Sequence, residues 1–485
     1  MSISRNTAYN LMGTLAPIFA AVLTIPAYLR LIGEQRYGVL AIVWLFVGYF
    51  GIFDIGLGRA VAQRVAGLHG THVEEARAKA FWTALSLNSG LGLIGALLLV
   101  PLASYYFSTQ LQLAPDVKAE VMRSMPLMGV LVFVAVATGS MIGFLHGVEK
   151  FRALNLANGT GSVLFFVAPL VAAMLWGANI LVVIMAVVAC RVAVFLLLLR
   201  MCQSHVRVSG APGFCMTEAR RLFGFGGWIA LSSLVSPFLV FADRLLIGSV
   251  LGPRAVTQYS VPYQLAERTS IVAAALASSL FPRYSRGTEE VRAELSVQAV
   301  KTLVVIMTPP CVVAILGAEL FLKYWISPEF AATSAVLAQF LLFGFWANSL
   351  ARIPHAHLQG AGRPKVVAIV QCAELVPFLG AMYYCLQRVG LEAASALIAI
   401  RLLLDFVLLS IWAGIFAKIL PFVLTGAVFL LTAIAVTVFA TTGTTQAAFG
   451  IATAVASLLW AAASMPPVLR HRLRSLASPV FSSRM

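Results

Sequence analysis

The chain has 485 residues, of which 60% are hydrophobic and 11% are charged, and its mean hydropathy is +0.93. Soluble globular proteins contain about 45–50% apolar and about 25% charged residues, so this composition excludes a soluble enzyme and a disordered chain. The net charge of +16 comes from short loops, without the aromatic-interleaved basic surface that would indicate binding to nucleic acid. Apolar runs recur along nearly the whole chain, and we therefore expect a polytopic membrane protein.

The apolar runs, separated by charged or Gly/Pro-rich breaks, predict an all-α protein with about fourteen membrane-spanning helices. Lys and Arg are about three times as frequent on one side of these spans as on the other, which predicts that both termini lie in the cytoplasm. No loop between the spans is long enough for a folded soluble domain. The expected spans are 9–31, 38–57, 81–102, 125–147, 153–176, 178–199, 224–249, 257–281, 299–322, 335–357, 366–386, 393–416, 421–440 and 447–465.

Two turns in different halves of the chain share a pattern. Leu31-Ile-Gly-Glu-Gln-Arg-Tyr-Gly follows the first span, and Val250-Leu-Gly-Pro-Arg-Ala-Val-Thr-Gln-Tyr follows the seventh, at an offset of about 220 residues. Internal repeats of this kind are typical of transporters, whose pathway lies at the interface between the repeats. We expect an N-lobe at 1–222, a C-lobe at 223–416, and two further helices with a basic tail at 417–485.

Several short motifs carry a family resemblance. The stretches Asn6-Thr-Ala-Tyr-Asn-Leu and Pro26-Ala-Tyr-Leu-Arg-Leu-Ile-Gly resemble the opening of polysaccharide flippases of the Wzx type. These flippases belong to the multidrug/oligosaccharidyl-lipid/polysaccharide exporter superfamily. Phe50-Gly-Ile-Phe-Asp54-Ile-Gly and Phe241-Ala-Asp243-Arg244 resemble later steps of the same family. The resemblance implies two pseudo-symmetric six-helix lobes that form a V around a central cavity, with two extra C-terminal helices.

The same resemblance implies a function in the bacterial inner membrane. The substrate would be an oligosaccharide unit on undecaprenyl diphosphate, flipped from the cytoplasmic to the periplasmic leaflet by alternating access. The polysaccharide would be O-antigen, capsule or exopolysaccharide. The implied partners are this lipid-linked oligosaccharide, the membrane lipids and polysaccharide polymerases.

Ionisable residues within the spans are the candidate site. A charge at the bilayer centre costs about 2.5–3.5 kcal/mol on insertion scales, so such a residue usually faces a cavity or a partner. Guanidinium groups match the oxygens of a diphosphate, and Tyr and Gln suit a sugar. The predicted substrate contacts are Arg191, Arg244, Arg268, Tyr263 and Gln264. The predicted gating or coupling carboxylates are Asp54, Asp243, Glu267, Glu374 and Asp405.

Structural alternatives stay open for these groups. Asp54 is also explained as a polar helix end, and the neighbours Asp243 and Arg244 as part of an interhelical ion-pair network. The adjacent Glu267 and Arg268 allow the same network explanation. Arg401 and Asp405, four residues apart, can neutralise each other on one helix face.

Two other functions compete with the flippase. A drug/cation antiporter of the same superfamily would have an acidic cavity, whereas the intramembrane charges here are balanced. A membrane-embedded polysaccharide polymerase or ligase would carry a large periplasmic loop with catalytic residues, and the sequence has no such loop. We therefore expect no catalytic residues, no metal site and no cofactor. Coupling to a proton gradient and coupling to a sodium gradient both stay open.

Overall fold

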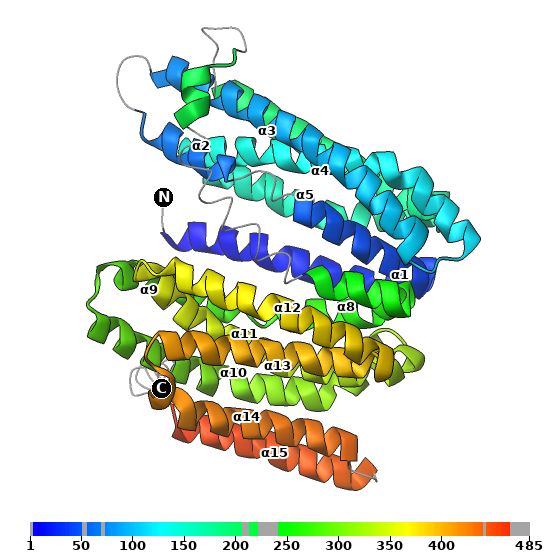
Figure 1. The fold of residues 1–485 in the computed structure, drawn as a ribbon, viewed down its shortest axis with the longest axis vertical. Coiled ribbons are helices and arrows are strands. Elements are labelled where there is room, and N and C mark those ends of the chain that lie inside the picture. The colour runs from blue at the N-terminus through cyan, green and yellow to red at the C-terminus, as the bar shows by residue number, and fades with distance from the viewer. Residues whose placement is uncertain are drawn as a thin grey trace, which may run out of the picture. The chain divides into compact units, whose positions relative to one another are not determined.

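The computed structural model describes residues 3–50, 56–68, 73–205, 213–221, 241–439 and 443–465. All regular secondary structure in these ranges is helical (Figure 1). The labelled elements are α1 (Ile3–Phe50), α2 (Leu57–Ala66), α3 (Val73–Tyr105), η2 (Tyr106–Gln110), α4 (Pro115–Gly147), α5 (Phe151–Trp176), α6 (Ile180–His205), α8 (Pro253–Arg268), α9 (Ile271–Arg286), α10 (Glu289–Trp325), α11 (Pro328–Gly360), α12 (Pro364–Arg388), α13 (Leu391–Trp412), α14 (Phe416–Phe439) and α15 (Gly443–Ala463). A helix at 241–251 precedes α8.

Ten helices in the described part of the chain are long and apolar enough to cross a membrane. They match the third to sixth and the ninth to fourteenth predicted spans, so the prediction of a multi-pass helical membrane protein is confirmed. Most of the seventh predicted span lies outside the described residues, and the total of fourteen stays a prediction. Several helices are longer than predicted: α4 and α10 have 33 and 37 residues and include segments expected to be loops.

The turn between the first two predicted spans lies inside α1, at Gly33. Its backbone has φ 79° and ψ 163°, which interrupts the helix in a region that residues with a Cβ rarely adopt. Gly252 occupies the matching position of the second copy of the turn motif and also has a positive φ of 84°. The two copies of the motif therefore share a backbone feature as well as a sequence pattern.

The eighth predicted span, 257–281, is not one continuous helix, which corrects the prediction. It is divided into α8 and α9 by a turn at Thr269 and Ser270. The Ser270 amide donates to the Glu267 carbonyl at 3.0 Å, and the Ser349 hydroxyl of α11 donates to the Ser270 hydroxyl at 3.1 Å. These bonds satisfy polar groups at the break, where the α-helical pattern of hydrogen bonds is interrupted.

The chain forms two compact units, Met1–Thr257 and Gln258–Met485, which we call unit 1 and unit 2. In unit 1, α4 packs closely against α2 and α3. A Cβ added at Gly143 would collide with the backbone of Gly58 on α2, so only glycine allows this approach. On the α3 side, the Asn88 amide donates to the Ser140 hydroxyl at 2.7 Å. The predicted lobe boundaries at 222 and 416 stay a prediction.

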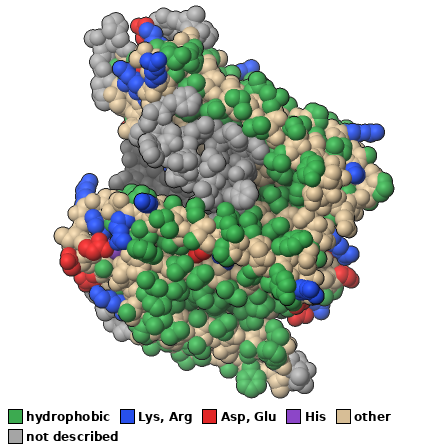
Figure 2. Space-filling model, in the orientation of Figure 1, with side chains coloured by type: hydrophobic (Ala, Val, Ile, Leu, Met, Phe, Trp, Pro, Cys, Tyr) green, Lys and Arg blue, Asp and Glu red, His purple; other side chains and the backbone are tan. Residues whose placement is uncertain are grey.

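Unit 2 has a core built on α10, α11 and α13. The fully buried Trp346 lies in this core and donates its indole N–H to the Thr308 hydroxyl at 3.2 Å. On the face shown in Figure 2, hydrophobic side chains cover the middle of the helices, and charged side chains gather toward the helix ends. This distribution is the one expected of helices that span a bilayer.

Candidate functional site

Arg191 lies near the middle of α6, at the depth of the hydrocarbon core if α6 spans the membrane. Its side chain is exposed, and its guanidinium carbon lies 4.7 Å from the centre of the Phe165 ring on α5. Within the described residues, no carboxylate is at salt-bridge distance from Arg191. An exposed cation at this depth requires water or an anion, because lipid contact is costly.

A row of aromatic rings continues from this arginine site into α1. The rings of Phe165 and Trp44 are 5.6 Å apart, and Trp44 contacts Tyr37 edge-on at 5.9 Å. Tyr37 in turn lies 6.2 Å from Tyr28, whose hydroxyl donates to the Phe166 carbonyl at 2.9 Å. This row was not predicted from the sequence, because the rings of α1 meet Phe165 only when α5 packs against α1.

Asp243 and Arg244 are both buried, with exposed fractions of 3% and 5%. The Asp243 carboxylate accepts a hydrogen bond from the Arg244 backbone amide at 2.6 Å. Because Arg244 is enclosed by protein, contact with a substrate would require the helix at 241–251 to rearrange.

The predicted residues of α8 lie just before the helix break. Glu267 and Arg268 are exposed at its C-terminal end, and Gln264 is half-buried one turn earlier. Tyr263 is instead 6% exposed, and its ring packs edge-to-face on Phe345 at 4.9 Å. Of the four, Tyr263 is therefore part of the helix packing, and the other three are at least partly accessible.

Three charged residues meet between α12 and α13. Glu374 is 6% exposed, and among the residues that the structure describes neither of its carboxylate oxygens has a hydrogen-bond partner. It lies within electrostatic range of Asp405 and Arg401. The charges of Arg401 and Asp405 interact, as their spacing suggested, but no salt bridge joins them in the described part of the chain. The Arg401 guanidinium carbon lies instead 4.9 Å from the centre of the Phe378 ring.

Asp54, the remaining predicted carboxylate, lies outside the described residues. Its assignment as a gating residue stays a prediction.

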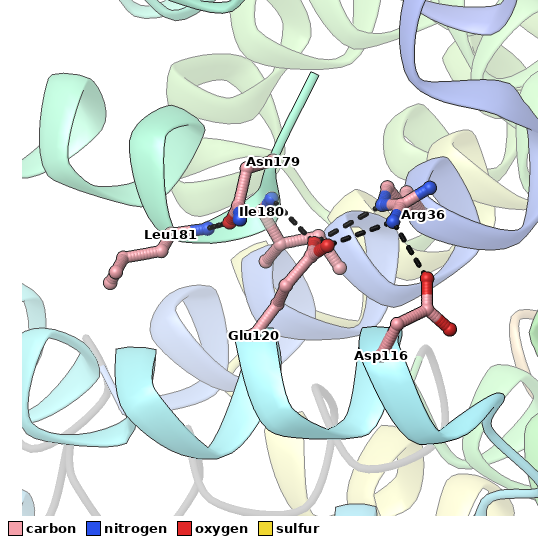
Figure 3. Close-up of polar contacts among 6 residues, drawn as sticks. All are labelled: Arg36, Asp116, Glu120, Asn179, Ile180 and Leu181. Atoms are coloured by element: carbon pink, nitrogen blue, oxygen red, sulfur yellow. Dashed lines mark hydrogen bonds and ion pairs between the residues drawn. The ribbon is translucent and has the colours of Figure 1, made fainter. Parts of the chain in front are cut away.

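The turn at Gly33 carries a network that sequence reasoning missed (Figure 3). Arg36 donates to Glu120 of α4 through Nε at 3.1 Å and Nη2 at 2.8 Å, and to Asp116 at 3.0 Å. Glu120 also accepts the backbone N–H of Ile180 at 3.0 Å, at the start of α6. One carboxylate therefore holds the turn, α4 and α6 together. The spacing of Asp116 and Glu120, one helical turn apart, was the available sequence signal.

The two copies of the turn motif contact each other directly. The Arg254 Nε lies 2.7 Å from the Glu34 carboxylate, and the Thr257 hydroxyl donates to the Glu34 carbonyl at 2.5 Å. Gly38 lies against the Pro253 carbonyl, so closely that a Cβ would collide with it. The start of α8 is thereby fastened to the turn at Gly33.

A second ion-pair network joins α2 to a short helix at 216–221. Arg64 donates to both carboxylate oxygens of Glu218, at 2.9 and 2.7 Å, and Arg221 adds a bond at 3.0 Å. Hydrogen bonding from the Arg64 guanidinium, outweighing the effect of burial, holds the pKa of the Glu218 carboxyl below its usual value.

The fold is that of known membrane transporters. The lipid II flippase MurJ, in an inward closed conformation, matches with a TM-score of 0.68 at 12% identity, over 93% of this chain and 98% of that one. An inward-facing multidrug resistance transporter of the MATE family matches with a TM-score of 0.66 at 17% identity, over 88% and 96% of the two chains.

The family follows from the sequence comparison. The model for the family "Polysaccharide biosynthesis protein" matches residues 3–288, more than half of the chain, and the chain belongs to this family. The MatE model matches residues 229–379. A Shigella flexneri protein named "Putative O-antigen transporter" is 29% identical over 411 residues, 84% of this chain and 97% of that protein. The uncharacterized membrane protein EpsK of Bacillus subtilis is 24% identical over 389 residues, 76% of this chain and 74% of that protein.

These relationships define a multi-pass membrane transporter of polysaccharide biosynthesis, and the predicted resemblance is confirmed. The Shigella relative is named as a putative transporter and the similar solved structures as a flippase and a transporter, none of them an enzyme, which argues against a membrane-embedded polymerase or ligase.

Proposed function

We propose that the chain flips an undecaprenyl-diphosphate-linked oligosaccharide from the cytoplasmic to the periplasmic leaflet of a bacterial inner membrane, by alternating access. The observation that carries the proposal is Arg191, an exposed residue at the middle of α6 whose guanidinium lies over an aromatic ring and has no carboxylate partner within the described residues. The family membership and the Shigella relative support a lipid-linked polysaccharide as the cargo.

Arg191 has the chemistry to bind the diphosphate. Its planar guanidinium offers donors that match phosphate oxygens, and the ring of Phe165 covers one of its faces. Half-buried Trp44, next to Phe165, offers a surface for a sugar ring. The enclosed Arg244 would contact the substrate only in another conformation, and Arg268 and Gln264 stay predicted substrate contacts of unit 2.

The cluster of Glu374, Asp405 and Arg401 is suited to coupling. Two carboxylates and one guanidinium lie within electrostatic range of one another, and burying an unpaired ionised carboxylate is costly. Uptake of one proton or one sodium ion by the carboxylates would balance the charge. Glu374→Gln should then abolish gradient-driven transport while leaving substrate binding intact, measured with purified protein in vesicles. Loss of binding in this variant would argue for a structural role.

The test of the function uses a deletion strain of the host. Without the protein, lipid-linked oligosaccharide should accumulate in the cytoplasmic leaflet, and the wild-type chain should restore its export. Arg191→Gln should fail to restore export at equal membrane abundance, whereas Arg191→Lys should restore part of it. Gly380→Ala, at an exposed position of α12 with open space around its Cβ, is the matched control. Normal export in the deletion strain would defeat the proposal.

The match of residues 229–379 to the MatE model favours one other function, a drug/cation antiporter. That function predicts resistance to cationic drugs on overexpression, together with unchanged surface polysaccharide in the deletion strain. The balanced charges of the predicted site favour the flippase.

A further inference from the structure

A cavity of about 560 Å³ opens between α10, α14 and α15 of unit 2. Cavities of about 300–1,000 Å³ are the size that holds small-molecule ligands. In Figure 1 these helices lie side by side at one edge of unit 2, and none of the residues assigned above to transport lines the cavity. The cavity therefore shares no lining residue with the candidate transport site.

The cavity is polar at one end and apolar along the rest of its depth. Lys323 lies two residues before the end of α10, Thr437 two residues before the end of α14, and Gln446 three residues after the start of α15. All three helix ends belong to the same side of unit 2. The deeper lining consists of apolar residues and glycines, such as Val313 and Ala454. This arrangement has a polar opening at the membrane surface and an apolar interior in the hydrocarbon.

The depth of the cavity corresponds to one leaflet. Its lining on α10 extends from Val313 to Lys323, about 15 Å at 1.5 Å per residue. The hydrocarbon core of a bilayer is about 30 Å thick, so this length equals that of one acyl chain in a single leaflet.

The charges at the opening select a headgroup. Glu319 and Lys323 lie one helical turn apart on α10, and both side chains are exposed. This spacing allows a salt bridge, yet none joins them, and neither pairs with another residue in the described part of the chain. A lysine beside a glutamate matches the phosphate and the ammonium of one zwitterionic headgroup, whereas the glutamate would repel an anionic lipid.

We infer that this cavity is a binding site for a zwitterionic bilayer phospholipid, phosphatidylethanolamine. One acyl chain lies along the apolar wall, the phosphate contacts Lys323 and the ethanolamine ammonium donates to Glu319. On the predicted topology the lipid comes from the periplasmic leaflet. The site binds a membrane component and does not depend on the cargo of the transporter.

Gly317 provides the test, because a Cβ added there would have no atom within 4 Å. A large side chain at this position would fill the cavity without displacing the protein. Gly317→Phe is therefore the filling variant. Gly380→Phe is its matched control, since Gly380 also has open space around it and lies outside the cavity, on α12.

The full chain is expressed in cells that contain phosphatidylethanolamine and phosphatidylglycerol, purified in detergent and washed. The lipid retained per protein is then measured by mass spectrometry. We expect the wild type and Gly380→Phe to retain phosphatidylethanolamine above its share in the membrane, and Gly317→Phe to lose this lipid. Glu319→Lys, an exposed change that spares the packing, should shift the retained lipid to phosphatidylglycerol.

Three results would overturn the inference. Equal retention of phosphatidylethanolamine by Gly317→Phe and the wild type would exclude the cavity as its site. If every variant retains lipids in the same proportions as the membrane, the retained lipid is annular and occupies no specific site. Loss of a prenyl-phosphate lipid from Gly317→Phe would assign the cavity to the carrier of the cargo. If Gly317→Phe does not fold, an unchanged lipid profile in Glu319→Lys overturns the headgroup assignment by itself.

Discussion

We expect the hydrogen bonds of the Glu120 carboxylate to make a large contribution to the stability of unit 1. It receives two hydrogen bonds from Arg36 and one from the Ile180 amide, and its side chain is 14% exposed. A hydrogen bond to a charged group contributes about 1.5–3 kcal/mol, and a buried N–H without an acceptor costs about 1–3 kcal/mol. Because Asp116 remains as a partner for Arg36, we expect Glu120→Ala to destabilise the fold by about 3 kcal/mol.

Two variants separate the contributions. Glu120→Gln keeps an acceptor for the Ile180 N–H and removes the negative charge. We therefore expect it to destabilise the fold by about half as much as Glu120→Ala. Asp116→Ala removes a partner whose side chain is 65% exposed, and should cost less than about 1 kcal/mol. The assay is unfolding of the purified chain in mixed micelles with increasing dodecyl sulfate, followed by tryptophan fluorescence. The reasoning is refuted if Asp116→Ala lowers the free energy of unfolding as much as Glu120→Ala does. It is also refuted if Glu120→Gln lowers it as much as Glu120→Ala does.

Three further predictions concern other contacts of unit 1. Glu34→Gln should destabilise the fold by less than about 1 kcal/mol, because the side chain of its partner Arg254 is 70% exposed, and a larger loss in the same unfolding assay would contradict this reasoning. Glu218, whose pKa is lowered by Arg64, should stabilise the fold by about 1 kcal/mol above its unfolded pKa and lose this as pH falls below about 4. Glu218→Gln should flatten that part of the curve of stability against pH, and an unchanged curve would contradict the assignment. Gly143→Ala should destabilise the α2–α4 contact by about 1–3 kcal/mol in the same unfolding assay, and a neutral effect would refute the close approach.

Some features of the site could be anticipated from the sequence, and others could not. The intramembrane position of Arg191 follows from the apolar residues around it, but its contact with Phe165 depends on how α5 and α6 are rotated. The pairing of Arg401 with Asp405 was expected from their spacing, whereas folding directs the guanidinium to Phe378. Spacing on one helix makes a contact possible, and the neighbouring helix determines whether it forms.

By itself the sequence determined that the protein is a multi-pass helical membrane protein, where ten of its helices lie, and that a glycine turn is repeated. These features are local, because the length of an apolar run and the freedom of a glycine backbone depend on no distant residue. Only the tertiary structure decided that the eighth span is broken at Ser270, that Glu120 joins three elements, and that Glu374 comes within electrostatic range of Asp405. These contacts depend on which faces the packed helices present to one another, and hydropathy is nearly the same on every face of a membrane helix.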